Sequence, residues 1–186
     1  MALSNPNSRK EIDDSASGKI FSRENIQTVV VAVLLALFIR TFVAEARFIP
    51  SGSMEPTLMI DDRLIVEKLT YDFLKPTRGQ IIVFMPPPNA HSDQAFIKRL
   101  IGMPGDTLEI ANGQVIINGV PQKEPYIAAP PDYYMPKTKV PEGNYFMMGD
   151  NRNNSQDSHI WGFLPRENII GQAVFRFWPL NRIGTL

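Results

Sequence analysis

The pattern of apolar and polar positions divides the chain into three parts. Residues 1–25 are polar without periodicity, which predicts a disordered tail. Residues 26–44 are almost continuously apolar, and the interruptions are Gln27, Thr28, Arg40 and Thr41. As a helix this stretch would rise roughly 28 Å, close to the ~30 Å hydrocarbon core of a bilayer. The pattern therefore predicts one transmembrane anchor, with Arg40 near an end where its side chain can reach the headgroups.

Residues 45–186 read as a β-rich domain beyond the anchor. Short runs of β-branched or aromatic residues are bounded by Gly, Pro or charged residues, at Leu64–Val66, Ile81–Phe84 and Ala173–Trp178. A Pro-rich loop, Met85–Asp93, separates two of the expected strands.

Residues 107–141 are expected to form a smaller inserted hairpin and loop region. Asn-Gly, a strong signal for a type I′ hairpin turn, occurs at Asn112-Gly113 and again at Asn118-Gly119. These turns predict a three-strand meander, followed by a Pro-rich loop over Pro121–Pro141. The predicted fold is thus mainly β, with one N-terminal transmembrane helix, an antiparallel β-sheet domain and a small Pro-rich insert.

Two other interpretations of the apolar stretch compete with an anchor. A buried core helix is possible because the uninterrupted apolar run, Val29–Ile39, is short, but the run is apolar on all sides. A cleaved secretory signal is possible because Ala44-Glu45-Ala46 has the form of a cleavage site, but the preceding polar segment is too long for an ordinary signal. A retained anchor is favoured. Lys and Arg residues are more frequent before the stretch than just after it, which predicts a cytoplasmic N-terminus and an extracytoplasmic domain.

Composition excludes several classes of function. With 19 Lys+Arg against 19 Asp+Glu the formal net charge is zero, which disfavours nucleic-acid binding. The chain has no cysteine, so disulfides, thiolate metal sites and cysteine nucleophiles are excluded. Only two histidines, His91 and His159, are present, which argues against a multi-histidine metal site. The sequence carries no signal for oligomeric state.

Three polar clusters, separated by strand-like sequence, hold the candidate chemistry. They are Ile49–Leu58, Phe96–Asp106 and Met148–Pro165. Two prolines and a glycine in the first cluster predict a stiff turn that exposes Ser51 and Ser53, although such a segment is more often merely a turn.

The second cluster contains two adjacent cations, Lys98 and Arg99, inside an apolar strand pattern. Alternation along a strand sends them to opposite faces, so one of them is expected to point toward the core. A buried lysine is destabilising unless it is neutral or has partners. The third cluster is dense in donors and acceptors, and a surface loop built from Asx turns would explain it equally well. Within it, Arg152 is a candidate for a structural ion pair with Asp150 or Asp157.

In this order, and after a single N-terminal span, the clusters resemble the type I signal peptidases, the membrane-bound serine/lysine proteases that remove signal peptides. The resemblance extends from about Ile26 to Trp178, includes Arg78–Phe84, and is weakest in the Pro-rich insert, Lys123–Val140. Each motif is short, but the ordered set is specific. The resemblance implies the β-sheet catalytic domain of that family and no metal or cofactor.

The resemblance also implies a role for each matching residue. Ser53 matches the nucleophile, and Lys98 matches the general base, whose pKa must be lowered by desolvation. Ser51 matches the hydroxyl that forms the oxyanion hole with the Ser53 N–H, and Ser155 matches the serine that orients the lysine amine. A supporting polar network is implied for Asp150, Arg152 and Asp157.

By the same resemblance, the substrate is a preprotein whose signal ends in small residues at positions −3 and −1, bound as an extended strand. Residues that align with the pocket lining are Ile49, Leu58, Val83, Phe96 and Ile97, each of which fits ordinary core nearly as well. Ser53 lies nine residues past Ala44, at most ~30 Å of extended chain, which predicts an active site close to the bilayer.

The chain departs from the common family pattern at two positions. His159 stands where many bacterial members have Arg, which puts the ion pair with Asp157 in doubt, and Gln80 stands where many have Asp.

Three rival functions remain. A Ser-His-Asp protease would use His159 and Asp157, but their proximity along the chain does not orient the imidazole toward Ser53. A self-cleaving Ser-Lys repressor would need a DNA-binding domain where this chain has an apolar span. A membrane-tethered binding or assembly module would explain the anchor and strands but would leave the Ser/Lys/Ser set coincidental.

Overall fold

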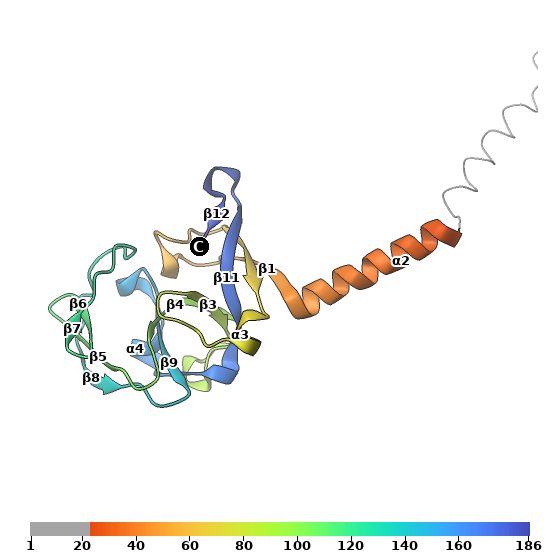
Figure 1. The fold of residues 1–186 in the computed structure, drawn as a ribbon. Helices are drawn as coiled ribbons and strands as arrows, with labels where there is room; N and C mark the ends of the chain where they lie inside the picture. Colours follow the sequence, from red (N-terminus) through yellow and green to blue (C-terminus); the bar gives the residue numbers. More distant parts are fainter. Residues whose placement is uncertain (1–22) are drawn as a thin grey trace, which may run out of the picture. The chain divides into compact units, whose positions relative to one another are not determined.

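The computed structural model describes residues 23–186 and divides the chain into two units, Met1–Phe42 and Val43–Leu186. Most of the predicted tail, residues 1–22, lies outside the described part. Helix α2 (Arg23–Phe38) continues into a π-helical turn, η1 (Ile39–Val43), so the helical segment begins slightly before the predicted anchor (Figure 1). Its 21 residues have a mean hydropathy of 2.3 over the most apolar window, and none of that window is buried within the protein.

The second unit contains a large antiparallel sheet of eight strands, in the order β1-β2-β11-β3-β4-β9-β10 with β12 paired to β11. The strands are β1 (Ala44–Phe48), β2 (Arg63–Glu67), β3 (Ile81–Phe84), β4 (Phe96–Gly102), β9 (Asn144–Met148), β10 (Leu164–Pro165), β11 (Ile169–Trp178) and β12 (Gly184–Thr185). The predicted strands of this sheet correspond to β2, β3 and β11, together with β4, which contains Lys98 and Arg99, and the mainly β antiparallel fold is confirmed. Strands β1, β9, β10 and β12 were not predicted.

A second sheet of four strands has the order β7-β6-β5-β8. Strands β5 (Thr107–Ala111), β6 (Gln114–Ile117) and β7 (Val120–Pro121) form the predicted meander, and the Asn and Gly residues of both turns have positive φ, as type I′ turns require. Strand β8 (Met135–Lys139) corrects the prediction that Pro121–Pro141 is a loop throughout. It is an edge strand, where Pro136 removes no ladder hydrogen bond from the sheet interior.

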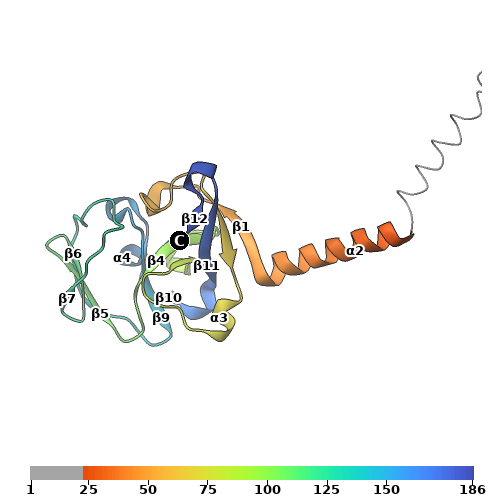
Figure 2. The same ribbon diagram turned by 45° about the horizontal axis from the view of Figure 1, so that its top comes forward.

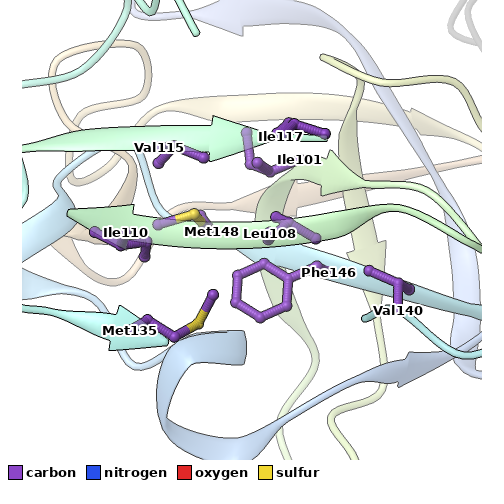
Figure 3. Close-up of a cluster of buried hydrophobic side chains, with 9 residues drawn as sticks. All are labelled: Ile101, Leu108, Ile110, Val115, Ile117, Met135, Val140, Phe146 and Met148. Atoms are coloured by element: carbon purple, nitrogen blue, oxygen red, sulfur yellow. The ribbon is translucent and has the colours of Figure 1, made fainter. Parts of the chain in front are cut away.

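The two sheets share a buried core. Figure 3 shows side chains of β5, β6 and β8 packed toward side chains of β4 and β9 from the large sheet. The cluster consists of Ile101, Leu108, Ile110, Val115, Ile117, Met135, Val140, Phe146 and Met148. Figure 2 shows the small sheet on one side of β4 and β9, with β11, β12 and β1 on the other. Strands β4 and β9 therefore lie at the centre of the unit, and the second and third polar clusters begin in them.

Short helical turns carry the rest of the polar clusters. The relevant turns are η2 (Gly52–Met54), η4 (Arg152–Asn154) and α4 (Ser158–Trp161), while α3 (Thr70–Phe73) connects β2 with β3. A further core cluster lies under the first polar cluster and includes Ile49, Met54 and Leu58. Because these three side chains are fully or almost fully buried on either side of Ser53, the turn that carries Ser53 is fixed to the sheet.

Candidate active site

Ser53 and Lys98 come together although they are far apart in the chain. Ser53 lies in η2 and Lys98 in β4, and Lys98 Nζ donates a hydrogen bond of 2.7 Å to Ser53 Oγ. Both residues are buried, at 8% and 5% relative exposure. The prediction that the turn exposes Ser53 was therefore wrong, because Met54 and Leu58 draw the turn into the core and face the hydroxyl inward. Ser51 does remain exposed.

Burial changes the acidity of Lys98. Desolvation lowers the pKa of Lys98 from 10.5 to about 8, while the charges of Asp157 and Asp150 oppose the shift. An ammonium cannot accept a proton, so this lowered pKa provides a useful fraction of neutral amine near neutral pH. At 2.7 Å from Ser53 Oγ, a neutral amine can take the hydroxyl proton directly.

The other two predicted serines line the same cleft. Ser51 Oγ lies 3.4 Å from Ser53 Oγ, which places a second hydroxyl beside that of Ser53. Ser155 is also buried, but its Oγ has no hydrogen-bond partner within residues 23–186, and the expected hydrogen bond to the Lys98 amine is not found there. Ser155 is held close by Gly149, where a Cβ would collide with Ser155 Oγ and with the backbone carbonyl of Ser53.

The predicted supporting network exists with different pairs. Asp150 is fully buried and accepts two hydrogen bonds from Arg99, with Nε at 2.8 Å and Nη2 at 2.6 Å. Arg152 pairs instead with Glu124, through Nη1 at 2.6 Å and Nη2 at 2.8 Å, and its Nε donates to the carbonyl of Gly149. The expected pairing of Arg152 with Asp150 or Asp157 was therefore wrong, because nearer partners satisfy each charge.

Asp157 keeps an ionisable partner despite the substitution at position 159. His159 Nδ1 lies 2.6 Å from Asp157 Oδ1, and Asp157 Oδ2 accepts the Gly149 N–H at 2.9 Å. The second departure, Gln80, hydrogen-bonds Tyr71 and Gln172 and does not line the cleft. Both departures are thus accommodated without disturbing the Ser53–Lys98 contact.

A cleft of about 560 Å³ opens over these groups. Its lining includes all of the predicted catalytic serines and Lys98, together with Phe96 and Ile97 from the predicted substrate pocket. The other predicted pocket residues, Ile49, Leu58 and Val83, are at most 4% exposed and do not line this cleft. Within residues 23–186 no group of three or more His, Asp or Glu side chains could hold a metal ion.

Several residues of the site were not found from the sequence. Arg99 was noted beside Lys98 without a role. Its guanidinium hydrogen-bonds Asp150, and its Cζ lies 4.1 Å from the ring centroid of Tyr126. Glu124 and Tyr133 lie in the Pro-rich insert, where the resemblance is weakest and no motif marks them. Tyr133 stacks on His159 with centroids 4.2 Å apart.

Comparison with known proteins identifies the family. Residues 22–178 match the model of a family described as signal peptidase, peptidase S26. A signal peptidase I from Leptolyngbya laminosa is 57% identical over 168 residues, which cover 88% of this chain and 83% of that protein. The chain belongs to the S26 signal peptidases.

Further relatives of this signal peptidase carry related names. A probable signal peptidase I-1 from Synechocystis sp. is 55% identical, covering 89% of this chain and 87% of that protein. Thylakoidal processing peptidase 1 from Arabidopsis thaliana is 40% identical, covering 87% of this chain and 50% of that protein. A crystal structure of a signal peptidase I from Enterococcus faecalis matches with a TM-score of 0.45 and 35% identity, covering 53% of this chain and 97% of that chain. The family match and the sequence relatives show that the protein is a serine protease of the signal peptidase I type, which cleaves signal peptides from preproteins.

We expect Gly149→Ala to abolish most preprotein cleavage by this signal peptidase. The new methyl group would displace either Ser155 or the turn that carries Ser53, and small displacements of reacting groups reduce rates strongly, by about 10²-fold for ~1 Å. The rate of cleavage by the purified full-length protein tests this, with Gly184→Ala as the control because a Cβ there meets no atom within 4 Å. Near-normal cleavage by Gly149→Ala would contradict the close contact.

Proposed function

We propose that this signal peptidase is a membrane-anchored endopeptidase that uses Ser53 as nucleophile and Lys98 as general base, and that it cuts preproteins after a small-x-small sequence. The observation that carries the proposal is the 2.7 Å hydrogen bond between the buried Lys98 amine and Ser53 Oγ. Two hydroxyl groups, of Ser51 and Ser155, border this pair in one cleft. His159 Nδ1 pairs with Asp157 as a Ser-His-Asp triad would need, but within residues 23–186 no hydrogen bond joins His159 to Ser53. The Ser-His-Asp alternative is disfavoured because Ser53 Oγ hydrogen-bonds Lys98 instead.

The chemistry follows from these positions. Neutral Lys98 removes the proton of Ser53 while Ser53 Oγ forms a bond to the scissile carbonyl carbon. The resulting oxyanion accepts hydrogen bonds from the Ser51 hydroxyl and the Ser53 N–H. The Lys98 ammonium then gives its proton to the leaving amine, and an acyl-enzyme on Ser53 remains. Lys98 next removes a proton from a water molecule as the water oxygen bonds to the ester carbonyl carbon. The bond from that carbon to Ser53 Oγ then breaks, and Lys98 returns the proton to Ser53 Oγ. The signal peptide leaves with a new carboxyl group, which loses its proton to solvent.

The cleft suits an extended chain with small side chains at the cut. Phe96 and Ile97 give one wall an apolar surface immediately before Lys98 in β4. Side chains beside the scissile bond would meet this wall, and small residues there allow the peptide backbone to approach the buried Ser53 most closely. Ile49, Leu58 and Val83 do not line the cleft. Ile49 and Leu58 lie in a core cluster against which Ile97 packs, and Val83 pairs with Ile97, so these residues support the wall from behind rather than contact the substrate.

The anchor determines where cleavage takes place. A helix of 21 residues rises roughly 31 Å, enough to cross a bilayer. Ser53 follows Val43, the last residue of that helical segment, by ten residues, so at most about 35 Å of extended chain separates them. The excess of Lys and Arg before the helix supports a cytoplasmic N-terminus. The catalytic unit then lies at the extracytoplasmic surface, where signal peptides emerge.

Replacing Ser53 tests the nucleophile. We expect Ser53→Ala to abolish cleavage of a preprotein and to leave folding intact, because one buried hydroxyl is lost without loss of apolar packing. Ser51→Ala should retain measurable activity with a loss of ~10²–10³ in rate, since the Ser53 N–H donor remains. Mass-spectrometric mapping of the cut site, together with circular dichroism, measures both effects. Turnover at the wild-type rate in Ser53→Ala would exclude this serine as the nucleophile.

Replacing Lys98 tests the base. We expect Lys98→Arg to be inactive, because arginine keeps the positive charge and cannot act as a base near neutral pH. In the wild type, kcat/KM should rise with pH and level off above a midpoint near 8, since deprotonation of Lys98 creates the base. His159→Ala should retain substantial turnover and should still show a rising limb, because Lys98 remains the base. An inactive His159→Ala beside an active Lys98→Ala would instead support the Ser-His-Asp mechanism.

Protease protection tests the topology. In sealed vesicles that have the cytoplasmic face outward, added protease should remove an N-terminal tag and leave residues beyond about 45 intact. Opening the vesicles with detergent should expose the rest of the chain and serves as the control. Release of the tag during maturation, by cleavage after Ala46, would show that the apolar segment is a cleaved signal.

A further inference from the structure

His159 forms part of the cleft wall and is held by two neighbours. Its Nδ1 lies 2.6 Å from Asp157 Oδ1, and its ring stacks on Tyr133 at an interplanar angle of 17°. The side chain is 18% exposed and lines the same cleft as Ser53 and Lys98. Protons from solvent therefore reach the ring while its orientation stays fixed.

Asp157 connects His159 with Lys98. It is fully buried, and His159 is the side chain that hydrogen-bonds to it within residues 23–186. The negative charge of Asp157 acts on Lys98 and favours the protonated amine, against the larger effect of burial. A carboxylate only accepts hydrogen bonds, so Nδ1 of a neutral His159 carries the proton and the imidazole adds no charge. A second proton on the ring would offset the charge of Asp157.

Two other ionisable groups near the ring, Arg152 and Tyr133, keep a constant charge between pH 5 and 8. The pair with Glu124 raises the pKa of Arg152 despite its burial, and burial raises the pKa of Tyr133 far above neutral. Histidine is the residue type whose charge changes in this range. Asp157 contacts the ring from its own turn, and Tyr133, Arg152 and Lys98 line the same cleft. Behind them, the charges of Asp132 and Glu124 act on Tyr133, and Glu124 also pairs with Arg152.

We propose that His159 is a positioning residue that, on gaining a proton, offsets the charge of Asp157 and makes Lys98 release its own proton more readily in acidic solution. The proposal rests on the proposed role of Lys98 as the base. As the pH falls, the activity of this signal peptidase should then decrease less steeply than that of an enzyme whose buried lysine base has no protonatable neighbour. An arginine at this position would exert the same effect at every pH, whereas histidine makes the effect depend on pH.

The pH profile of kcat/KM is the first test. Full-length wild type, His159→Gln and His159→Arg are compared from pH 5.5 to 9.5 with a preprotein-derived peptide that has no ionisable side chains, each normalised to its own alkaline plateau. At pH 5.5 we expect the normalised kcat/KM of His159→Gln to fall about threefold or more below wild type, as a unit charge nearby would produce. His159→Arg should have its midpoint at lower pH than wild type. Superimposable normalised profiles would overturn the proposal.

The reciprocal effect on His159 is the second test and needs no activity. The chain has two histidines, so His91→Gln in untagged protein leaves His159 as the single histidine signal in an NMR titration. Replacing Lys98 with Met should raise the titration midpoint of His159 by roughly half a pH unit, because linkage is reciprocal and a nearby cation is lost. Lys137→Met, which removes an exposed lysine, is the control and should cause no shift.

The two tests separate this proposal from the proposed mechanism. An active Lys98→Arg enzyme would refute Lys98 as the base, and the pH profiles could then no longer be attributed to the protonation of Lys98. An unchanged His159 midpoint in Lys98→Met would refute the coupling even if Lys98→Arg is inactive. A shifted midpoint together with superimposable normalised profiles would likewise overturn the proposal, because the coupling would then have no effect on the base.

Discussion

The contact between a buried lysine amine and a serine hydroxyl sets the conditions that the rest of the catalytic unit meets. Burying a lysine to 5% exposure destabilises the protein unless the amine is largely neutral or opposite charges lie nearby. Burial in β4 lowers the pKa of Lys98 to about 8, and Asp150 and Asp157 limit the decrease. Each of those carboxylates is held in turn, Asp150 by Arg99 and Asp157 by His159 and the Gly149 N–H. The reactivity of one amine thus depends on a connected set of buried charges.

Residues of the Pro-rich insert hold this set of charged residues in place on the sheet. Glu124 and Arg152 form a buried bidentate ion pair, with side-chain exposures of 5% and 0%. Removing one member of such a pair destabilises a protein by about 3–5 kcal/mol, because the other charge stays buried alone. The backbone N–H of Ala128 also donates to the carbonyl of Asp150 at 3.0 Å. A segment without catalytic residues therefore holds the loop that carries Ser155 and Asp157.

The sequence predicted those parts of the structure whose cause is local. The Asn-Gly turns and the β-branched runs gave the meander and strands β2, β3 and β11 because turn chemistry and alternation act between neighbouring residues. Lys98 and Ser53 were found through a family resemblance, since 45 positions separate them and no local pattern joins them. The partners of Arg152 and Asp150 were mistaken because ion pairs between distant segments depend on packing. Strand β8 was missed because its proline is tolerated only at a sheet edge.

The order of the strands also limits where an extended polypeptide can add to the enzyme. Within residues 23–186 five strands have a single partner: β1, β10 and the two-residue β12 in the large sheet, and β7 and β8 in the small one. Three of these contain a proline, at Pro121, Pro136 and Pro165, and β1 carries Glu45 and Arg47. Prolines and charges on an edge strand oppose pairing with a further strand. An enzyme that repeatedly meets unfolded, strand-forming chains is thereby protected from becoming the template on which they aggregate.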